Sequence, residues 1–165
     1  MKIQEKIALI TGAAGGIGRA LALEMGKRGV GHLALVDQSA EVLDLARMLN
    51  EMMGRSIATG YSGDVTDPSF RTNVYHDMRD KFGPVTICVP AAGITRDELA
   101  VKMDKQKGEA LVYPLEKFRL VTEINLIAPV YWAMEMVAGV AQERHRLGKG
   151  GWEPEERTQG VVATA

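Results

Sequence analysis

Short apolar runs alternate along this chain with longer stretches in which apolar residues recur every three or four positions. The runs are typical of buried strands, and the longer stretches are typical of helices with one apolar face. The four strands expected first are residues 7–10, 33–36, 56–61 and 85–89. This alternation predicts an α/β fold in which a parallel sheet is joined by right-handed crossovers and carries helices on both faces.

Helix signals fill the intervals between the runs. Ile17, Leu21 and Met25 recur at four-residue steps, and Gly29 ends that stretch. A second helix is expected over residues 39–54. A third begins at Asp67-Pro68, where the aspartate supplies a cap and the proline suits the first turn, and it stops at Gly83-Pro84.

The second half of the chain is less regular. Residues 94–114 are charged and predict a solvated connection, and a long helix is expected over residues 115–144. The glycine-rich residues 147–160 predict a mobile loop before a short fifth strand at 161–163. We therefore expect a doubly wound, Rossmann-type sheet of five strands in the order 3-2-1-4-5, within one domain spanning residues 1–165.

Composition and charge narrow the possible classes of protein. The apolar share of 46% and charged share of 25% are those of a globular protein. A net charge of −1 gives no electrostatic reason to expect nucleic acid or an anionic membrane as a partner. No apolar run approaches the roughly 18 residues of a membrane span and no signal-peptide core is visible, so the default expectation is a cytoplasmic protein.

Cysteine and histidine offer no sign of metal or disulfide chemistry. The single cysteine, Cys88, lies inside an apolar run and predicts a small buried thiol. The three histidines are far apart in the sequence and have no metal-ligand spacing, so we predict no metal.

The segment Thr11-Gly12-Ala13-Ala14-Gly15-Gly16-Ile17-Gly18 follows the first strand and opens the first helix. Gly12 would permit a tight turn, Gly16 would let the backbone approach a pyrophosphate, and Gly18 would let the helix pack closely on the strand. The free N–H groups of the helix terminus then face the anion. The segment predicts a dinucleotide-binding turn, the alternative being an ordinary glycine-rich turn.

An acidic residue ends the second strand. Asp37 lies 37 − 18 = 19 residues after Gly18, the spacing of the carboxylate that accepts hydrogen bonds from an adenosine ribose diol. Such a carboxylate repels a 2′-phosphate, and Gln38, Ser39 and Gly15 add no cation that would neutralise one. Asp37 therefore favours NAD over NADP. The alternative is an aspartate that serves only a loop or a helix cap.

Four strand ends place polar or glycine residues at one edge of the predicted sheet. Gly12, Asp37, Asp64 and Gly93 each follow a different strand. Ligands of doubly wound sheets bind at the carboxyl ends of the strands, so we expect these four positions to border a single crevice.

In these motifs the chain resembles the short-chain dehydrogenase/reductase family, and the resemblance covers essentially its whole length. The glycine turn is similar to the family's TGxxxGxG motif, which implies that Ala14, Gly15 and Ile17 line the cofactor. Asp64-Val65 resembles the pair that contacts adenine, although a simple strand-end turn at Gly63-Asp64 would look the same locally.

Two further motifs carry the resemblance. Residues 90–93, Pro-Ala-Ala-Gly, occupy the place of the family's NNAG motif without its asparagines, which leaves backbone contacts at Ala91, Ala92 and Gly93. Asn125 matches the family's active-site asparagine. The resemblance implies that its backbone carbonyl holds a water, which is part of a proton relay to the catalytic lysine. Pro129 has no N–H for the carbonyl of residue 125, so we expect a kink that frees that carbonyl.

The family's chemistry needs a serine, a tyrosine and a lysine beyond the fifth strand, where this sequence stops. Tyr113 and Lys117 have the right mutual spacing, but they precede Asn125, and Pro114 keeps Tyr113 out of a regular helical turn. We expect this pair not to be catalytic, and we expect the chain alone to bind NAD without turnover.

Three functions remain open from the sequence. The first is the cofactor-binding part of an NAD-dependent alcohol dehydrogenase or ketone reductase, acting on a small-molecule substrate. The second is a complete, non-catalytic NAD(H)-binding module, and the third is a doubly wound domain for another nucleotide such as S-adenosylmethionine. The resemblance also implies a homo-oligomer.

Overall fold

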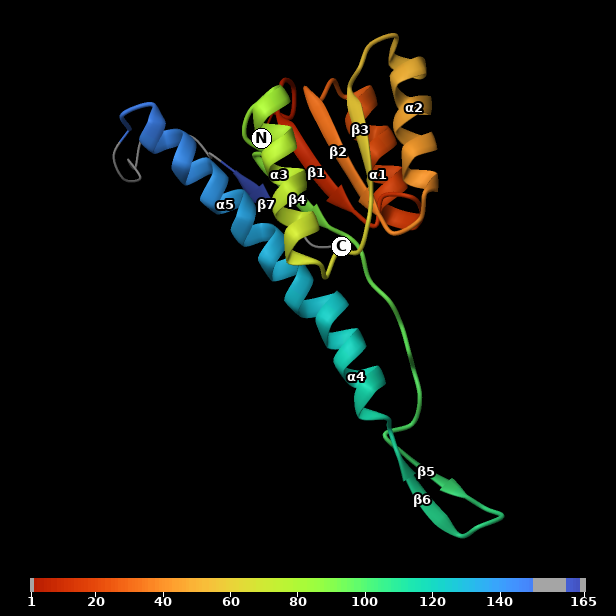
Figure 1. Ribbon diagram of the computed structural model, residues 1–165. Helices are drawn as coiled ribbons and strands as arrows, with labels where there is room; N and C mark the ends of the chain where they lie inside the picture. Colours follow the sequence, from red (N-terminus) through yellow and green to blue (C-terminus); the bar gives the residue numbers. More distant parts are fainter. Residues whose placement is uncertain (1, 150–159, 164–165) are drawn as a thin grey trace.

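The computed structural model describes residues 2–149 and 160–163, and its centre is a five-stranded parallel sheet (Figure 1). The strand order is β3-β2-β1-β4-β7, so the predicted order 3-2-1-4-5 is confirmed with β7 as the fifth strand. The strands are β1 (Ile7–Thr11), β2 (His32–Asp37), β3 (Ala58–Ser62), β4 (Ile87–Pro90) and β7 (Val161–Val162). The predicted loop over 147–160 lies mostly outside the described residues.

Helices cover both faces of the sheet, as the alternating pattern predicts. α1 (Gly16–Lys27) and α2 (Glu41–Met53) lie on one face, and α3 (Pro68–Phe82) and α5 (Ala128–Arg146) lie on the other (Figure 1). The expected cap of α3 is present, because the Asp67 side chain accepts hydrogen bonds from two backbone N–H groups at its start.

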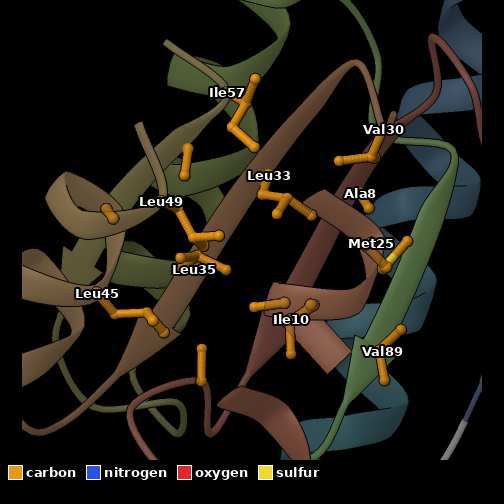
Figure 2. Packing of buried hydrophobic residues seen from close by; sticks show 14 of the residues in the cluster. Ala8, Ile10, Met25, Val30, Leu33, Leu35, Leu45, Leu49, Ile57 and Val89 are labelled. Atoms are coloured by element: carbon orange, nitrogen blue, oxygen red, sulfur yellow. The ribbon is translucent and has the colours of Figure 1, made fainter. Parts of the chain in front are cut away.

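Alternate residues of the central strands build two separate cores. Ile10, Leu33 and Leu35 belong to the cluster under α1 and α2 (Figure 2), whereas Leu9 and Val36 belong to the cluster under α3 and α5. Full burial of a side chain of this size stabilises the fold by about 1.5–3 kcal/mol. Two buried faces explain why these strands read as continuous apolar runs rather than alternating ones.

Two strands begin two residues later than the sequence predicts. The expected runs 56–61 and 85–89 correspond to β3 from Ala58 and β4 from Ile87. Ile57 and Val85 are nevertheless buried, at 0% and 3% exposure. The apolar pattern indicates which residues are buried, and in both segments the buried residues begin before the hydrogen bonds of the strand do.

The segment expected to be an irregular connection contains an antiparallel hairpin. β5 (Val101–Asp104) pairs with β6 (Glu109–Val112), and Val101 lies opposite Val112 while Met103 lies opposite Ala110. Directly opposed residues share a face, so one face of the hairpin is apolar. The expectation was wrong because the intervening charged residues hid this alternation.

The long helix is continuous but not uniform. α4 (Leu115–Thr122) passes through the π-helical turn η1 (Glu123–Ile127) into α5. Pro129 cannot donate to the carbonyl of Asn125, and π-helical turns occur mostly as single turns inside α-helices. The irregularity predicted at Pro129 therefore takes the form of a π-helical turn directly before it.

This helix is also more apolar than the sequence analysis allowed. Over Leu115–Arg146 its most apolar 18-residue window has a mean hydropathy of 1.4, which is enough by length and composition to cross a membrane. Only 17% of that window is buried, although Ala128, Trp132 and Met136 pack into the core under α3. The expectation that no segment approaches this length was wrong.

Candidate functional site

The turn between β1 and α1 has the geometry that its glycines predict. Gly12 has φ = 67°, and a Cβ on it would lie 2.8 Å from the carbonyl oxygen of Ala91. A Cβ on Gly18 would collide with the carbonyl oxygen of Gly12. At Gly15 and Gly16 a Cβ would meet nothing within 4 Å, so open space lies directly in front of the α1 N-terminus.

The carboxyl ends of the strands border one cavity of about 420 Å³. Its lining includes residues that follow β1, β2, β3 and β4, which are the four strand ends singled out from the sequence. Six of the predicted cofactor residues are among them: Gly12, Asp37, Asp64, Val65, Ala92 and Gly93. We refer to this cavity as the crevice.

The other predicted cofactor residues lie near the crevice without lining it. Ala14 lines a neighbouring hollow of about 280 Å³, and Ile17 is 67% exposed on the first turn of α1. Gly15 and Gly16 form the start of that helix, and Ala91 packs against the core under α1 and α2. All five therefore surround the helix terminus or the end of β4.

Asp37 is held in place by two backbone groups. Its Oδ2 accepts a hydrogen bond from Ala14 N at 2.9 Å, and its Oδ1 accepts one from Ser39 N at 2.9 Å. The end of β2 is thereby tied to the glycine turn. Each carboxylate oxygen has a further acceptor site, so the carboxylate can still accept from a diol.

One cation near Asp37 escaped the sequence analysis. Arg19, one turn into α1, lines the same hollow as Ala14, together with Glu41 and Asp44 of α2. Asp44 is itself paired with Arg47 at 2.6 Å. Arg19 is the residue that would attract a 2′-phosphate, and Asp37 is the residue that would repel one.

Asp64 and Val65 form the far wall of the crevice after β3. Asp64 Oδ1 accepts from both Thr66 N (2.8 Å) and Thr66 Oγ1 (2.7 Å), which fixes the orientation of its carboxylate. The carbonyl of Val65 accepts a hydrogen bond from Trp132 Nε1 at 2.9 Å. Trp132 is 1% exposed and therefore belongs to the core.

At the end of β4 the chain is tied to β1 and to η1. Ala92 N donates to Thr11 Oγ1 at 3.1 Å. The Asn125 side chain pairs with the backbone of Ile94, accepting from its N–H at 2.9 Å and donating to its carbonyl at 2.8 Å. Asn125 does not line the crevice itself. Its side chain positions Ile94, which does.

The Tyr113 and Lys117 side chains serve the hairpin base. Tyr113 Oη donates to the carbonyl of Arg96 at 2.7 Å, and Lys117 forms an ion pair with Glu98. Neither side chain lines the crevice. Tyr113 and Lys117, whose spacing resembles that of a catalytic pair, instead hold residues 96–98 against the start of α4.

Cys88 has the predicted buried position in β4, at 0% exposure. Burial raises the pKa of its thiol to about 11, and its sulfur lies 3.4 Å from Tyr75 Oη. The thiol stays protonated at neutral pH, which is a poor state for a nucleophile. Within residues 2–149 and 160–163, no three His, Cys, Asp or Glu side chains form a group that could hold a metal.

Arg96, Leu120 and Ile124 also line the crevice, and sequence reasoning did not identify them. Leu120 and Ile124 are four residues apart and so share one face of the long helix. That spacing was visible in the sequence, but which face of the helix meets the crevice was not. Arg96 carried no pattern at all, because its place depends on the contacts that hold the segment after β4.

Comparison with known families and proteins agrees with this geometry. A family model described as short chain dehydrogenase matches residues 6–146. The chain is 32% identical over 145 residues to the 3-oxoacyl-[acyl-carrier-protein] reductase FabG of Escherichia coli (strain K12), covering 88% of this chain and 53% of that protein. It is 34% identical over 108 residues to the 2,3-dihydro-2,3-dihydroxybenzoate dehydrogenase of Bacillus subtilis (strain 168), covering 66% of this chain and 41% of that one.

A solved structure supports the fold. The structure of a short-chain type dehydrogenase/reductase from Mycobacterium marinum superposes with a TM-score of 0.74 at 24% identity, covering 99% of this chain and 56% of that one. The chain thus spans about half the length of the relatives and structures it matches.

Proposed function

This chain belongs to the short-chain dehydrogenase/reductase family of nicotinamide-dependent oxidoreductases, and from that premise we propose that it supplies the NAD-binding part of such an enzyme. The reaction would transfer a hydride between the nicotinamide and an alcohol or ketone. The matched relatives support this class through their names, which are those of a reductase and a dehydrogenase.

The fit of the site to a dinucleotide rests on the open helix terminus. Any residue other than glycine at positions 15 and 16 would place a side chain in the space in front of the helix. The N–H groups of the first turn of α1 face that space. A pyrophosphate there would place the adenosine half toward β2 and β3 and the nicotinamide half toward β4. Bound NAD would supply the hydride acceptor, and the chain would supply its orientation.

The observation that carries NAD over NADP is the position of Asp37. Its carboxylate lies at the tip of β2, tied to Ala14 of the glycine turn at 2.9 Å, where the adenosine ribose would bind. A diol can donate to this carboxylate, whereas a 2′-phosphate would meet a like charge. Arg19 in the adjoining hollow is the competing attraction, and two carboxylates share that hollow with it.

Titration calorimetry of the chain with NAD and with NADP tests the proposal. NAD should bind at least about tenfold more tightly, since losing a charge-assisted pair of hydrogen bonds costs about 1.5–3 kcal/mol. Asp37→Ala should weaken NAD by about tenfold or more and abolish the preference, while Asp80→Asn, an exposed change on α3, should alter neither affinity. Tighter binding of NADP that is lost in Arg19→Gln would overturn the assignment.

For the proton chemistry we propose a role for the Asn125 main chain. Its side chain is committed to Ile94, and Pro129 offers no N–H to its carbonyl. That carbonyl is therefore available to hold a water at the π-helical turn, next to the nicotinamide side of the crevice. The catalytic tyrosine and lysine of the family would act from outside this sequence, so we propose that the chain alone binds NAD without turnover.

The exposed face of the long helix supports self-association. Leu126, Val130, Met134 and Val137 are spaced three or four residues apart and are 43–59% exposed. Large exposed apolar patches are found at protein–protein interaction sites. We propose that it faces a second copy in a homo-oligomer, and that the protein works in the cytoplasm on a small-molecule substrate rather than on nucleic acid or at a membrane.

A further inference from the structure

The extended segment after β4 is fixed at three alternate residues. The backbone of Ile94 is held by the Asn125 side chain, which accepts a hydrogen bond from its N–H at 2.9 Å and donates one to its carbonyl at 2.8 Å. The carbonyl of Arg96 accepts from Tyr113 Oη at 2.7 Å, and Glu98 is paired with Lys117. The partners of this segment come from η1, the hairpin base and α4. These contacts fix the path of the segment beside the crevice.

An apolar groove lies where this segment meets the hairpin and α4. It has a volume of about 590 Å³, and its apolar lining comes from Ala100, Val112, Leu115, Phe118 and Val121. We call it the hairpin groove. Figure 1 shows the hairpin and α4 together at the end of the long helix farthest from the C-terminal turn of α5. A groove of this size and lining suits an alkyl chain or a ring.

Arg96 lines both the hairpin groove and the crevice. It follows β4, which is separated from β2 by β1, so its segment leaves the sheet about 10 Å from the end of β2, where Asp37 lies. This is the side on which the nicotinamide would lie. The side chain of Arg96 donates to the adjacent Thr95 carbonyl at 2.7 Å and has further N–H groups to offer an anion.

The charges around Arg96 locate where an anion would bind. Asp97 and Glu98 line the hairpin groove but are not among the crevice residues, and Glu98 is already paired with Lys117. The acids of the crevice, Asp37 and Asp64, belong to the strands β2 and β3 on the adenosine side. At the junction of the two cavities the charge is therefore that of Arg96.

We infer that the junction of the hairpin groove and the crevice binds an apolar carboxylic acid, and that Arg96 selects it. The carboxylate pairs with the Arg96 guanidinium beside the nicotinamide, and the apolar body of the acid lies in the hairpin groove. This inference rests on the proposed function, because it makes the hydroxy and keto forms of such acids the substrate class of the oxidoreductase, their alcohol or ketone carbon exchanging the hydride with the nicotinamide. It gives Arg96 a specificity role and the hairpin a binding role.

Calorimetry of the NAD-saturated chain with octanoate and with octanamide tests the charge. Octanamide has the same alkyl chain without the negative charge. The wild-type chain should bind octanoate about tenfold more tightly than octanamide, the size expected of an accessible charge-assisted pair. Arg96→Gln should remove that difference, and Arg119→Gln, an exposed arginine of α4 that lines neither cavity, should keep it.

Two further variants separate charge from packing. Asp97→Asn should tighten octanoate binding by up to about threefold, since it removes a like charge from the groove. Phe118→Ser should weaken octanoate and octanamide equally. Shortening the acid from octanoate to butyrate should lower affinity by up to about fourfold for each methylene that leaves the groove.

The outcomes distinguish the two proposals. If NAD binds but octanoate does not, or if Arg96→Gln leaves the octanoate preference intact, the acid site is wrong while the NAD site stands. If Arg96→Gln lowers NAD affinity as much as it lowers octanoate affinity, Arg96 belongs to the cofactor and the acid site is again wrong. If NAD itself fails to bind, the proposed function falls first.

Discussion

The body formed by β1–β4 and the arm formed by residues 94–126 differ in where their apolar side chains go. β1, β2 and β4 are buried along almost their whole length, whereas β5 and β6 are exposed at seven of their eight positions. In the body most apolar side chains of the strands pack into the two cores. In the arm the order depends on one hairpin and three anchors, which leaves its apolar face for a ligand or another molecule.

The largest expected contrast comes from one leucine in each region. Leu35 in β2 is 0% exposed and Leu111 in β6 is 50% exposed. Leu35→Ala should lower the free energy of unfolding by about 2–5 kcal/mol, because it leaves a cavity in a packed core. Leu111→Ala should change it by less than about 0.5 kcal/mol. Urea unfolding of both variants measures this, and equal losses would erase the distinction between body and arm.

A buried histidine makes the stability of the body depend on pH. Burial, with the nearby Arg55 charge, lowers the pKa of His32 to about 4, and its ring stacks on Phe82 with centroids 3.5 Å apart. Above about pH 6.5 the histidine is neutral in both states. As the pH falls from there toward 4, the unfolded chain takes up the proton first, so the folded state loses stability.

The expected loss is about 2 kcal/mol between pH 7 and pH 4.5. His32→Gln removes the titration and keeps an amide within reach of Thr59, whose Oγ1 lies 2.9 Å from His32 Nε2. Subtracting the pH dependence of this variant from that of the wild type isolates the histidine from the carboxylates. A difference of zero across this interval would mean that the pKa of His32 is the same in the folded and unfolded states, which would contradict the effect of burial.

The smallest effect is expected at an anchor of the arm. Tyr113→Phe removes the hydrogen bond to the Arg96 carbonyl and should cost about 0.5 kcal/mol, near the low end for a partly exposed bond. Hydrogen exchange of residues 94–104 should quicken by about two- to threefold while exchange in β1 and β2 stays unchanged. The matched control is Tyr131→Phe on α5. Slower exchange in the arm, or a loss spread over the body, would contradict the anchoring role.

The same contrast explains what the sequence could predict. In the body, the patterns of buried residues and turn residues are local in the sequence. The order of the five strands, the Asp67 cap and the glycine turn could therefore be predicted from the sequence. Asp37 could be located because it ends a predicted strand, and Asp64 because it follows one closely. Strand starts were less certain because apolar residues such as Ile57 pack before the ladder begins.

The arm could not be predicted in the same way. The hairpin alternation at Val101 and Met103 was short and interrupted by charges, and no buried face reinforced it. The contacts of Tyr113 and Lys117 join residues 17 and 19 positions apart, which depends on side-chain reach rather than on spacing along one element. Arg96 gained its position in the crevice only through those contacts.

The central claim is that the crevice at the carboxyl ends of β1–β4 holds NAD, and crystals of the chain grown with NAD test it most directly. The diffraction data should show the pyrophosphate in front of Gly15 and Gly16 and both ribose hydroxyls of the adenosine within hydrogen-bonding distance of Asp37. Adenosine density away from Asp37, or a crevice left empty at saturating NAD, would contradict the account.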